Sequence, residues 1–316
     1  MLEALHVGTQ GFSPRTRSDG QLVRFGADAA RVALRGTRTP GVPLELELTL
    51  RPGEGKRARL NGVGLPSAEG LRAEVATLVF TPDRLAVVKG GPGVRRAYLD
   101  RALGRLLPSR ATVPTAYATA LGQRNIALRR VALGVSSREA LAPWTGRVAE
   151  LGTELVEARR EALRFLAPAF TERAGALALP DGMLLYTGEP PTIDGLEARL
   201  ERDLERGATG LGPHLDDIGI LAGDRDLRLY GSQGEQRLAV LALILAEAAA
   251  LAERRAVPPL LLLDDVLSEL DGDRRAALLA SLPPGGQAIL SATSAEAMPR
   301  EPDQLLEVTP GLVTVR

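Results

Sequence analysis

Four consecutive leucines run directly into two aspartates at residues 260–265, and this segment limits the possible folds more than any other. A short apolar run of this kind is typical of a strand that is buried on both faces of a parallel sheet. The neighbouring patterns predict helices over 235–254 and 271–281 and strands over 259–264 and 286–292. Because strand, helix and strand alternate, we predict an α/β fold with a covered parallel sheet.

The remaining sequence predicts three parts. Residues 1–92 form a strand-rich part, with a helix over 1–9 and strands over 22–35, 44–50 and 57–60. Residues 93–178 form a helical insertion, with helices over 94–107, 112–134 and 137–173. Residues 179–316 form the second α/β part, which begins with strands and turns over 180–230 and ends with two short strands within 304–316. No internal repeat or low-complexity segment is present.

The composition excludes several classes of protein. The chain has no cysteine and only two histidines, His6 and His214, which excludes disulfides, a cysteine nucleophile and a histidine-rich metal centre. The longest strictly apolar run, Leu238 to Ala246, has nine residues, whereas a membrane-spanning helix needs about 20. We therefore expect no transmembrane helix, and with no secretory pattern at the N-terminus we expect a cytoplasmic location.

The net charge of the chain does not indicate nucleic-acid binding, because 39 basic residues balance 39 acidic ones. Only Lys56 and Lys89 among the basic residues are lysines. The other basic residues are arginines, which we attribute first to a GC-rich genome. Locally, however, the planar guanidinium can bind phosphate with two parallel hydrogen bonds.

Two aspartates form the first candidate site. Asp264 and Asp265 follow the predicted buried strand, at the sheet edge where α/β folds bind ligands. A carboxylate at this edge can hold Mg²⁺ through water, and its neighbour can orient or deprotonate an attacking water. The alternative is an aspartate pair that only caps the next helix.

A second candidate site lies at the start of the apolar helix. Ser232 and Gly234 open this helix, where free N–H groups and the helix dipole favour an anion. Glu235, three residues after Ser232, also predicts a capping box. The two interpretations are compatible, because the same geometry presents donors to a phosphate.

The order of these segments resembles an ATP-binding-cassette ATPase, with a signature motif at 231–237, a Walker B strand at 260–265 and a D-loop at 268–271. Further stretches make the resemblance specific to the RecF family of bacterial recombination mediators. They are 2–5, 13–17, 79–83, 88–92 with Arg95, Arg96 and Asp100, 123–125, Gly212-Pro-His-Leu-Asp-Asp217, Gln233-Gly-Glu-Gln-Arg237 and 263–271. The match covers essentially the whole chain. It implies a cassette-type, SMC-head-like ATPase sheet with an inserted helical arm domain over 93–178.

The resemblance also implies roles for individual residues. Asp264 would hold Mg²⁺ and Asp265 would act as the general base. The signature residues Ser232, Gln233, Gly234 and Gln236 would contact the γ-phosphate of ATP in trans. The D-loop residues Ser268 and Asp271 would lie across the dimer. His214 would neighbour the nucleotide, with a purely structural histidine as the alternative. Apart from the resemblance, Arg95, Arg96 and Arg124 are candidate DNA contacts. For Arg95 and Arg96, at the start of a predicted helix, the alternatives are interdomain contacts or a solvated face.

The resemblance implies that the protein acts as an ATP-dependent homodimer associated with the nucleoid. Its implied partners are duplex DNA, gapped DNA, RecR and RecO. The implied processes are DNA repair, recombination, replication restart and the SOS response.

Two departures from the family pattern matter. Leu215 stands where the family usually has an arginine. No GxxxxGK[ST] motif (Walker A) occurs in the sequence, and Gly53-Glu-Gly-Lys56 lacks its spacing and its Ser/Thr. We interpret the chain as a RecF that lacks its first strand and P-loop, through a misassigned start or a gene fragment. We therefore expect neither tight ATP binding nor hydrolysis.

Two rival functions remain from the sequence. One is a nucleotide-free DNA-binding or scaffold protein of the same fold. The other is a different SMC-like or transporter-type cassette ATPase, which would need a long coiled coil or a membrane partner, and the sequence predicts neither.

Overall fold

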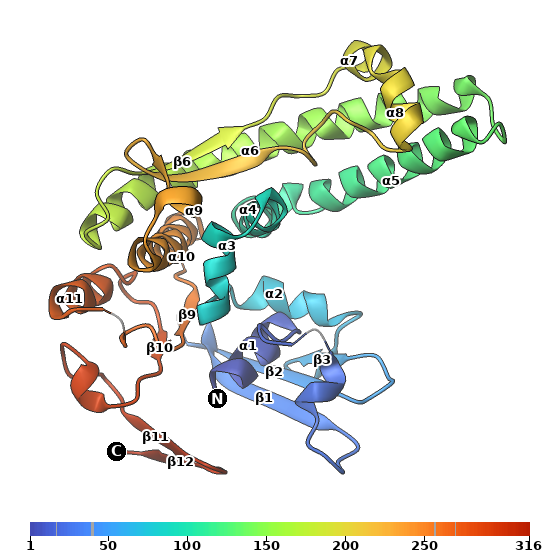
Figure 1. Ribbon diagram of the computed structural model, residues 1–316. Helices are drawn as coiled ribbons and strands as arrows, with labels where there is room; N and C mark the ends of the chain where they lie inside the picture. Colours follow the sequence, from blue (N-terminus) through green and yellow to red (C-terminus); the bar gives the residue numbers. More distant parts are fainter. Residues whose placement is uncertain (17, 39–40, 256, 269) are drawn as a thin grey trace. The chain divides into compact units, whose positions relative to one another are not determined.

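The structure is a computed structural model of the chain, and it describes residues 1–16, 18–38, 41–255, 257–268 and 270–316. Arg17 and Glu269, which belong to two of the motifs quoted above, lie outside the described residues. The chain divides into two compact units (Figure 1). The first contains residues 1–84, 176–178 and 251–316, and the second contains residues 85–175 and 179–250. The predicted domain ranges stay a prediction.

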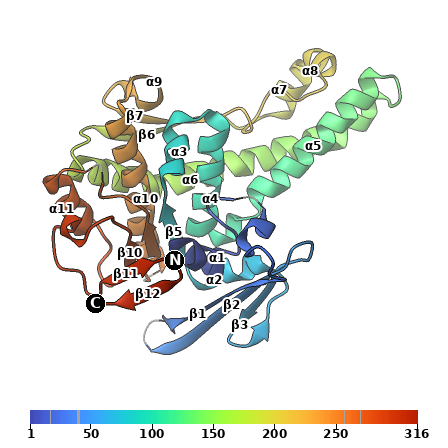
Figure 2. The same ribbon diagram turned by 60° about the horizontal axis from the view of Figure 1, so that its bottom comes forward.

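An antiparallel sheet forms one part of the first unit (Figure 2). Its strands, in spatial order, are β1 (Ala30–Arg38), β2 (Val42–Leu50), β3 (Arg57–Leu60) and β4 (Val63–Gly64). The leucines at 44, 46, 48 and 50 of β2 are buried together with Val7 of α1 (Leu2–Gln10), as the alternating pattern predicts. Gly8 lets α1 approach this sheet closely, because a Cβ there would lie 2.7 Å from Leu34 Cδ1.

One strand of this sheet is shorter than the sequence predicts. The strand expected over 22–35 begins only at Ala30. Residues Asp19–Leu22 form a 3₁₀ turn, and Gly26 takes a φ of 78°, outside the extended region. The expectation is therefore wrong for residues 22–29.

The parallel sheet predicted from the leucine run is present in the first unit. Strand β9 (Leu260–Leu263) lies between β5 (Thr77–Phe80) and β10 (Ala288–Leu290), and both neighbours are parallel to it. The side chains of Leu261, Leu262 and Leu263 are fully buried. The unit also contains α2 (Leu71–Glu74), α11 (Gly272–Ala280) and the hairpin of β11 (Leu306–Thr309) and β12 (Leu312–Val315).

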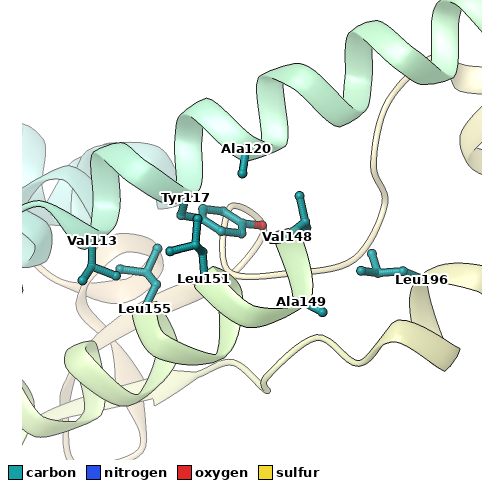
Figure 3. Packing of buried hydrophobic residues seen from close by; sticks show 8 residues of the cluster. All are labelled: Val113, Tyr117, Ala120, Val148, Ala149, Leu151, Leu155 and Leu196. Atoms are coloured by element: carbon teal, nitrogen blue, oxygen red, sulfur yellow. The ribbon is translucent and has the colours of Figure 1, made fainter. Parts of the chain in front are cut away.

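Three long helices lie in the predicted helical segment of the second unit. They are α4 (Pro92–Leu106), α5 (Val113–Ala132) and α6 (Ala142–Ala176), which confirms the predicted helical segment. Helix α6 begins later than expected because Arg138–Leu141 form a 3₁₀ turn. Helices α5 and α6 lie side by side and bury a cluster that includes Tyr117, Val148 and Leu155 (Figure 3).

The rest of the second unit combines a small sheet with further helices. The sheet has the order β6 (Gly182–Thr187), β7 (Asp217–Ala222) and β8 (Arg225–Asp226). The helices are α3 (Ala86–Lys89), α7 (Ile193–Ala198), α8 (Leu200–Arg206), α9 (Leu227–Tyr230) and the start of α10 (Gln233–Arg255). The expectation of strands and turns over 180–230 missed α7 and α8, although Leu196, Leu200 and Leu204 recur at helical spacing.

Among the residues that the structure describes, no helix combines the length and the apolar character that crossing a lipid bilayer would need.

Candidate functional site

The two aspartates lie at the carboxyl end of the parallel strands in the first unit. The ladder continues one residue past β9, because Asp264 N donates to Phe80 O (3.0 Å) and Ser291 N donates to Leu263 O (3.0 Å). Asp265 then takes a left-handed backbone conformation with a φ of 50°, which is uncommon outside glycine. The chain therefore turns sharply between the two carboxylates, leaving Asp264 half-buried and Asp265 exposed.

Both carboxylate oxygens of Asp264 have protein partners. Ser291 Oγ donates to Asp264 Oδ1 (2.8 Å), and Arg15 Nη2 donates to Asp264 Oδ2 (2.5 Å). Ser291 Oγ also accepts from the backbone N–H of Asp265 (2.9 Å). One hydroxyl group thus connects the two candidate catalytic residues.

Neither Arg15, which belongs to the 13–17 stretch, nor Ser291 has a role that was predicted from the sequence. Ser291 follows strand β10, which is parallel to β9, so that both strand ends meet at one sheet edge. That Ser291 lies near Asp264 could therefore have been predicted, because it follows from the two predicted parallel strands alone. The contact of Arg15 with Asp264 could not be predicted in this way, since the two residues are 249 positions apart in the sequence.

A short turn directs Arg15 towards the sheet edge. Ser13 Oγ donates to Glu3 Oε1 (2.5 Å) and accepts from the backbone N–H groups of Arg15 (3.0 Å) and Thr16 (3.1 Å). A serine hydroxyl that binds the two following N–H groups forms a local turn. This turn fixes the backbone at Arg15 relative to helix α1.

The two predicted D-loop residues, Ser268 and Asp271, lie three and six residues after Asp265. Ser268 Oγ donates to Asp265 O (3.2 Å). Asp271 is the N-cap of α11 and accepts from Arg274 N (2.9 Å). The alternative that the pair at 264–265 caps this helix is therefore wrong, because Asp271 provides the cap.

The signature segment begins helix α10 in the second unit. Ser232 N donates to Glu235 Oε2 (2.8 Å), and Glu235 N donates to Ser232 Oγ (3.2 Å), which confirms the predicted capping box. Arg225 of β8 donates to Glu235 Oε1 (2.8 Å). The hydrogen bonds from Arg225 and Ser232 lower the pKa of Glu235 to about 2.

The other signature residues divide into exposed and buried positions. Ser232, Gln233 and Gly234 are exposed at the helix start. Gln236 is buried, and its Nε2 donates to Leu227 O of α9 (2.8 Å). Gln236 therefore ties α10 to α9, and the exposed N-terminal residues present the donors that an anion would meet.

Both ring nitrogens of His214 form hydrogen bonds with protein groups. Its Nε2 lies 2.9 Å from Thr209 O, and its Nδ1 lies 2.7 Å from Tyr117 Oη. A carbonyl oxygen only accepts, so Nε2 carries the proton and Nδ1 accepts from the tyrosine. Burial lowers the pKa of His214 below its ordinary value. Because both nitrogens bind protein groups, this geometry favours the structural interpretation of His214. The neighbouring Leu215 side chain is 58% exposed.

Arg124 is deeply buried. It is 0% exposed, and its guanidinium donates to Asp203 Oδ2 (2.9 Å), Thr209 Oγ1 (2.7 Å) and Thr145 Oγ1 (3.3 Å). Its burial argues against a direct contact with DNA, because phosphate binding needs an accessible guanidinium.

Arg95 and Arg96 also have protein partners. Arg95 is buried and donates to both carboxylate oxygens of Asp217, at 2.7 and 2.6 Å. Arg96 is half-buried and donates to Asp216 O (2.5 Å). These contacts support the interpretation in which both arginines hold the segment of residues 212–217 in place.

The described residues form neither a complete site for a divalent cation nor a cradle for a nucleotide. Asp264 offers an oxygen ligand of the kind that Mg²⁺ prefers, although no group of three or more metal-binding side chains occurs in the described part of the chain. The Gly53–Lys56 segment is no phosphate loop, because Lys56 Nζ binds Gly11 O (2.7 Å) and Asp19 (3.1 Å). A cradle for the ATP phosphates is therefore not formed by these residues.

Comparisons with known proteins agree on one family, although no family model matches the chain. The chain is 36% identical over 312 residues to the DNA replication and repair protein RecF of Symbiobacterium thermophilum, covering 94% of this chain and 82% of that protein. It is 39% identical over 318 residues to RecF of Anaeromyxobacter sp. (strain K), with coverages of 93% and 82%.

Solved structures give the same result. A structure of the recombination mediator protein RecF with ATP, from the RecFOR pathway, superimposes with a TM-score of 0.85 at 26% identity, covering 100% of this chain and 87% of that one. An SMC head bound to the C-winged helix domain of ScpA superimposes with a TM-score of 0.57 at 15% identity, covering 100% of this chain and 84% of that one. This second likeness shows the fold alone. The predicted cassette-type, SMC-head-like ATPase fold is confirmed, and the chain belongs to the RecF family of DNA replication and repair proteins.

Proposed function

We propose that this protein acts as a recombination mediator that binds duplex DNA near gaps and works with RecR and RecO in loading a recombinase. The processes served would be DNA repair, replication restart and the SOS response. The proposal is supported by the family and by the likeness to a RecF of the RecFOR pathway. The observation that carries it is the pair Asp264 and Asp265 at the carboxyl edge of the parallel sheet, next to a D-loop that begins at Ser268.

Within this function, the site residues take the roles that the family implies. Asp264 would bind the divalent cation, and Asp265 would orient or deprotonate a water. Ser232, Gln233 and Gly234 would meet the γ-phosphate of ATP bound to a second copy in a homodimer. Ser232 Oγ accepts from Glu235 N, so its own proton can be donated to a phosphate oxygen.

ATP binding is the part of this function that the 316 residues support least. Without a Walker A sequence, no backbone cradle and no lysine bind the β- and γ-phosphates. We expect the purified 316-residue chain to bind ATP only at millimolar concentrations or above. Isothermal titration calorimetry measures this affinity, and a micromolar dissociation constant would contradict the expectation.

DNA binding tests the proposed function directly. The assay is fluorescence anisotropy with a labelled gapped duplex, and an intact duplex of equal length is the control. We expect tighter binding to the gapped duplex. We also expect a linear fall of log K with log salt, at a slope of about −0.9 per phosphate contact. Equal affinity for both duplexes, or no binding at low salt, would refute a mediator that acts near gaps.

A second candidate function is an ATP-independent DNA-binding scaffold of the same fold. The ion pair between Arg15 and Asp264 favours it, because an internal cation already occupies the carboxylate that would bind the metal. Adding ATP and Mg²⁺ to the same DNA titrations separates the two functions. Affinity that rises with ATP supports the mediator with a working nucleotide site. Unchanged affinity supports the scaffold.

A further inference from the structure

Phe25 differs from the other phenylalanines of the chain, because its side chain is fully exposed. Phe80 and Phe170 are 0% exposed, and Phe12 packs its ring against His6, with the ring centroids 4.9 Å apart. Removing an aromatic ring from water stabilises a fold, so a ring that stays in water adds nothing to that stability. Phe25 is therefore free to contact another molecule.

A tight turn holds Phe25 away from the core. Ala27 N donates to Arg24 O (3.0 Å), and Gly26 takes a φ of 78°, as the third residue of a type II turn requires. A Cβ at Gly26 would meet no atom of the described residues within 4 Å. The turn over residues 24–27 therefore projects into solvent.

The chain on both sides of this turn is anchored in the core of the first unit. Leu22 and Val23 before the turn, and Ala30 after it, pack against the buried cluster of the antiparallel sheet. The apolar neighbours of Phe25 have thus entered the core, whereas Phe25 has not. Because both ends are fixed, the turn presents the ring at a lower cost in conformational entropy than a free loop would.

The residues around Phe25 indicate the kind of partner. Residues 24–29 are all exposed, and Phe25 is the only large apolar side chain among them. A protein partner needs a wider apolar patch, whereas one ring matches the face of a single nucleobase. The guanidinium of Arg24 forms no hydrogen bond or ion pair with the described residues, so it can bind a phosphate beside that base.

We propose that Phe25 stacks on an unpaired nucleobase of gapped DNA, and that Arg24 binds the neighbouring phosphate. Every base has a π-face, so this contact needs no particular sequence. In an intact duplex the bases are paired and stacked on one another, so the ring meets no free face. Phe25 thus supplies a preference for gaps. This inference rests on the proposed function, because it takes gapped DNA as the ligand.

The test repeats the anisotropy titrations of the gapped and the intact duplex with the full chain and its variants. We expect F25A to bind the gapped duplex about tenfold more weakly and the intact duplex with unchanged affinity. F25W keeps an aromatic ring and should keep the preference for the gap. R24Q should weaken binding to the gapped duplex and reduce its salt slope by about 0.7, the value for one phosphate of a single strand.

V63A is the matched control, because Val63 of β4 is another exposed apolar side chain of the same unit, at 69% exposure. It should bind both duplexes as the unmodified chain does. A second readout does not depend on affinity. Iodouracil placed in the gap should cross-link to Phe25 under near-ultraviolet light, and mass spectrometry of the digested complex locates the cross-link.

The possible failures are distinguishable. Circular dichroism confirms that each variant is folded, which we expect of F25A because the ring is fully exposed. A gap preference that F25A retains, an equal loss on both duplexes, or an equal loss in V63A would overturn this inference and leave the proposed function intact. An unmodified chain that binds both duplexes equally, or binds neither, would refute the proposed function and this inference together.

Discussion

The buried ion pair of Arg124 and Asp203 gives the sharpest prediction about stability. Both side chains are 1% exposed. Asp203 also accepts from Gly210 N (3.0 Å). Asp203→Ala therefore leaves a guanidinium inside the helical unit without a counter-charge, and it leaves a backbone N–H without an acceptor. Breaking a buried pair from one side costs about 3–5 kcal/mol of unfolding free energy.

The same helix offers a control. Glu201 lies two residues before Asp203 and pairs with Arg138 at 2.5 Å, but these side chains are 69% and 57% exposed. An exposed pair contributes little to stability, because water and salt screen the attraction between its charges. Glu201→Ala should therefore lower the unfolding free energy only slightly. The contrast between the two variants depends on burial, because both remove one carboxylate from α8.

Urea is uncharged, so unfolding in urea measures the unfolding free energy of both variants without changing the ionic strength. Trp144, the only tryptophan of the chain, lies in helix α6 of the same unit and reports the transition by fluorescence. At 1 M salt the small effect of Glu201→Ala should vanish, because the screening length falls to about 3 Å, while that of Asp203→Ala should persist. Equal losses in the two variants, or a loss for Asp203→Ala below about 1 kcal/mol, would refute the assignment of Arg124 to a buried structural network.

Three further predictions concern the pH dependence of two side chains and the N-cap of α10. The pKa of Glu235 is lowered to about 2, so its ion pair stabilises the fold above its ordinary pKa and is lost as the pH falls towards 2. Melting temperatures between pH 7 and 2.5 should therefore fall more steeply for the unmodified chain than for E235Q, and parallel curves would contradict this. The pKa of His214 is lowered by burial, so the unfolded chain binds a proton more readily and stability falls below the ordinary histidine pKa. H214Q should remove this loss between pH 7.5 and 5.5 in the same assay. Ser232→Ala should cost about 1 kcal/mol through loss of the N-cap, and an unchanged urea midpoint would exclude that role.

The structure changes how the arginines of the family motifs are understood. Arg95 and Arg96 both bind the segment of residues 212–217, and Arg159 of α6 supports the same segment by donating to Pro213 O (2.7 Å). Arg159 also donates to both oxygens of Asp100. In a chain with balanced charge, motif arginines thus contribute to internal structure through the same paired hydrogen bonds that would bind a phosphate.

Local patterns in the sequence were sufficient for the strands β2 and β9 and for the capping box, although they missed α7 and α8. The leucines of β2 alternate with polar residues, and the run at 260–263 has the length and composition of a buried strand. Ser232 and Glu235 are three residues apart, which is the separation that one helical turn brings together. In each case the periodicity of a single element determines the contact, so neighbouring residues carry the whole signal.

Only the tertiary structure decided which residues surround the candidate site. Arg15 and Asp264 are 249 residues apart, and Tyr117 and His214 are 97 apart. The sequence shows that an arginine or a histidine is present, but not which partner the folded chain brings to it. Burial decides whether the same guanidinium contacts solvent or an aspartate, and burial depends on how remote elements pack. For that reason the position of Asp264 at the end of its strand could be predicted, whereas its partner Arg15 could not.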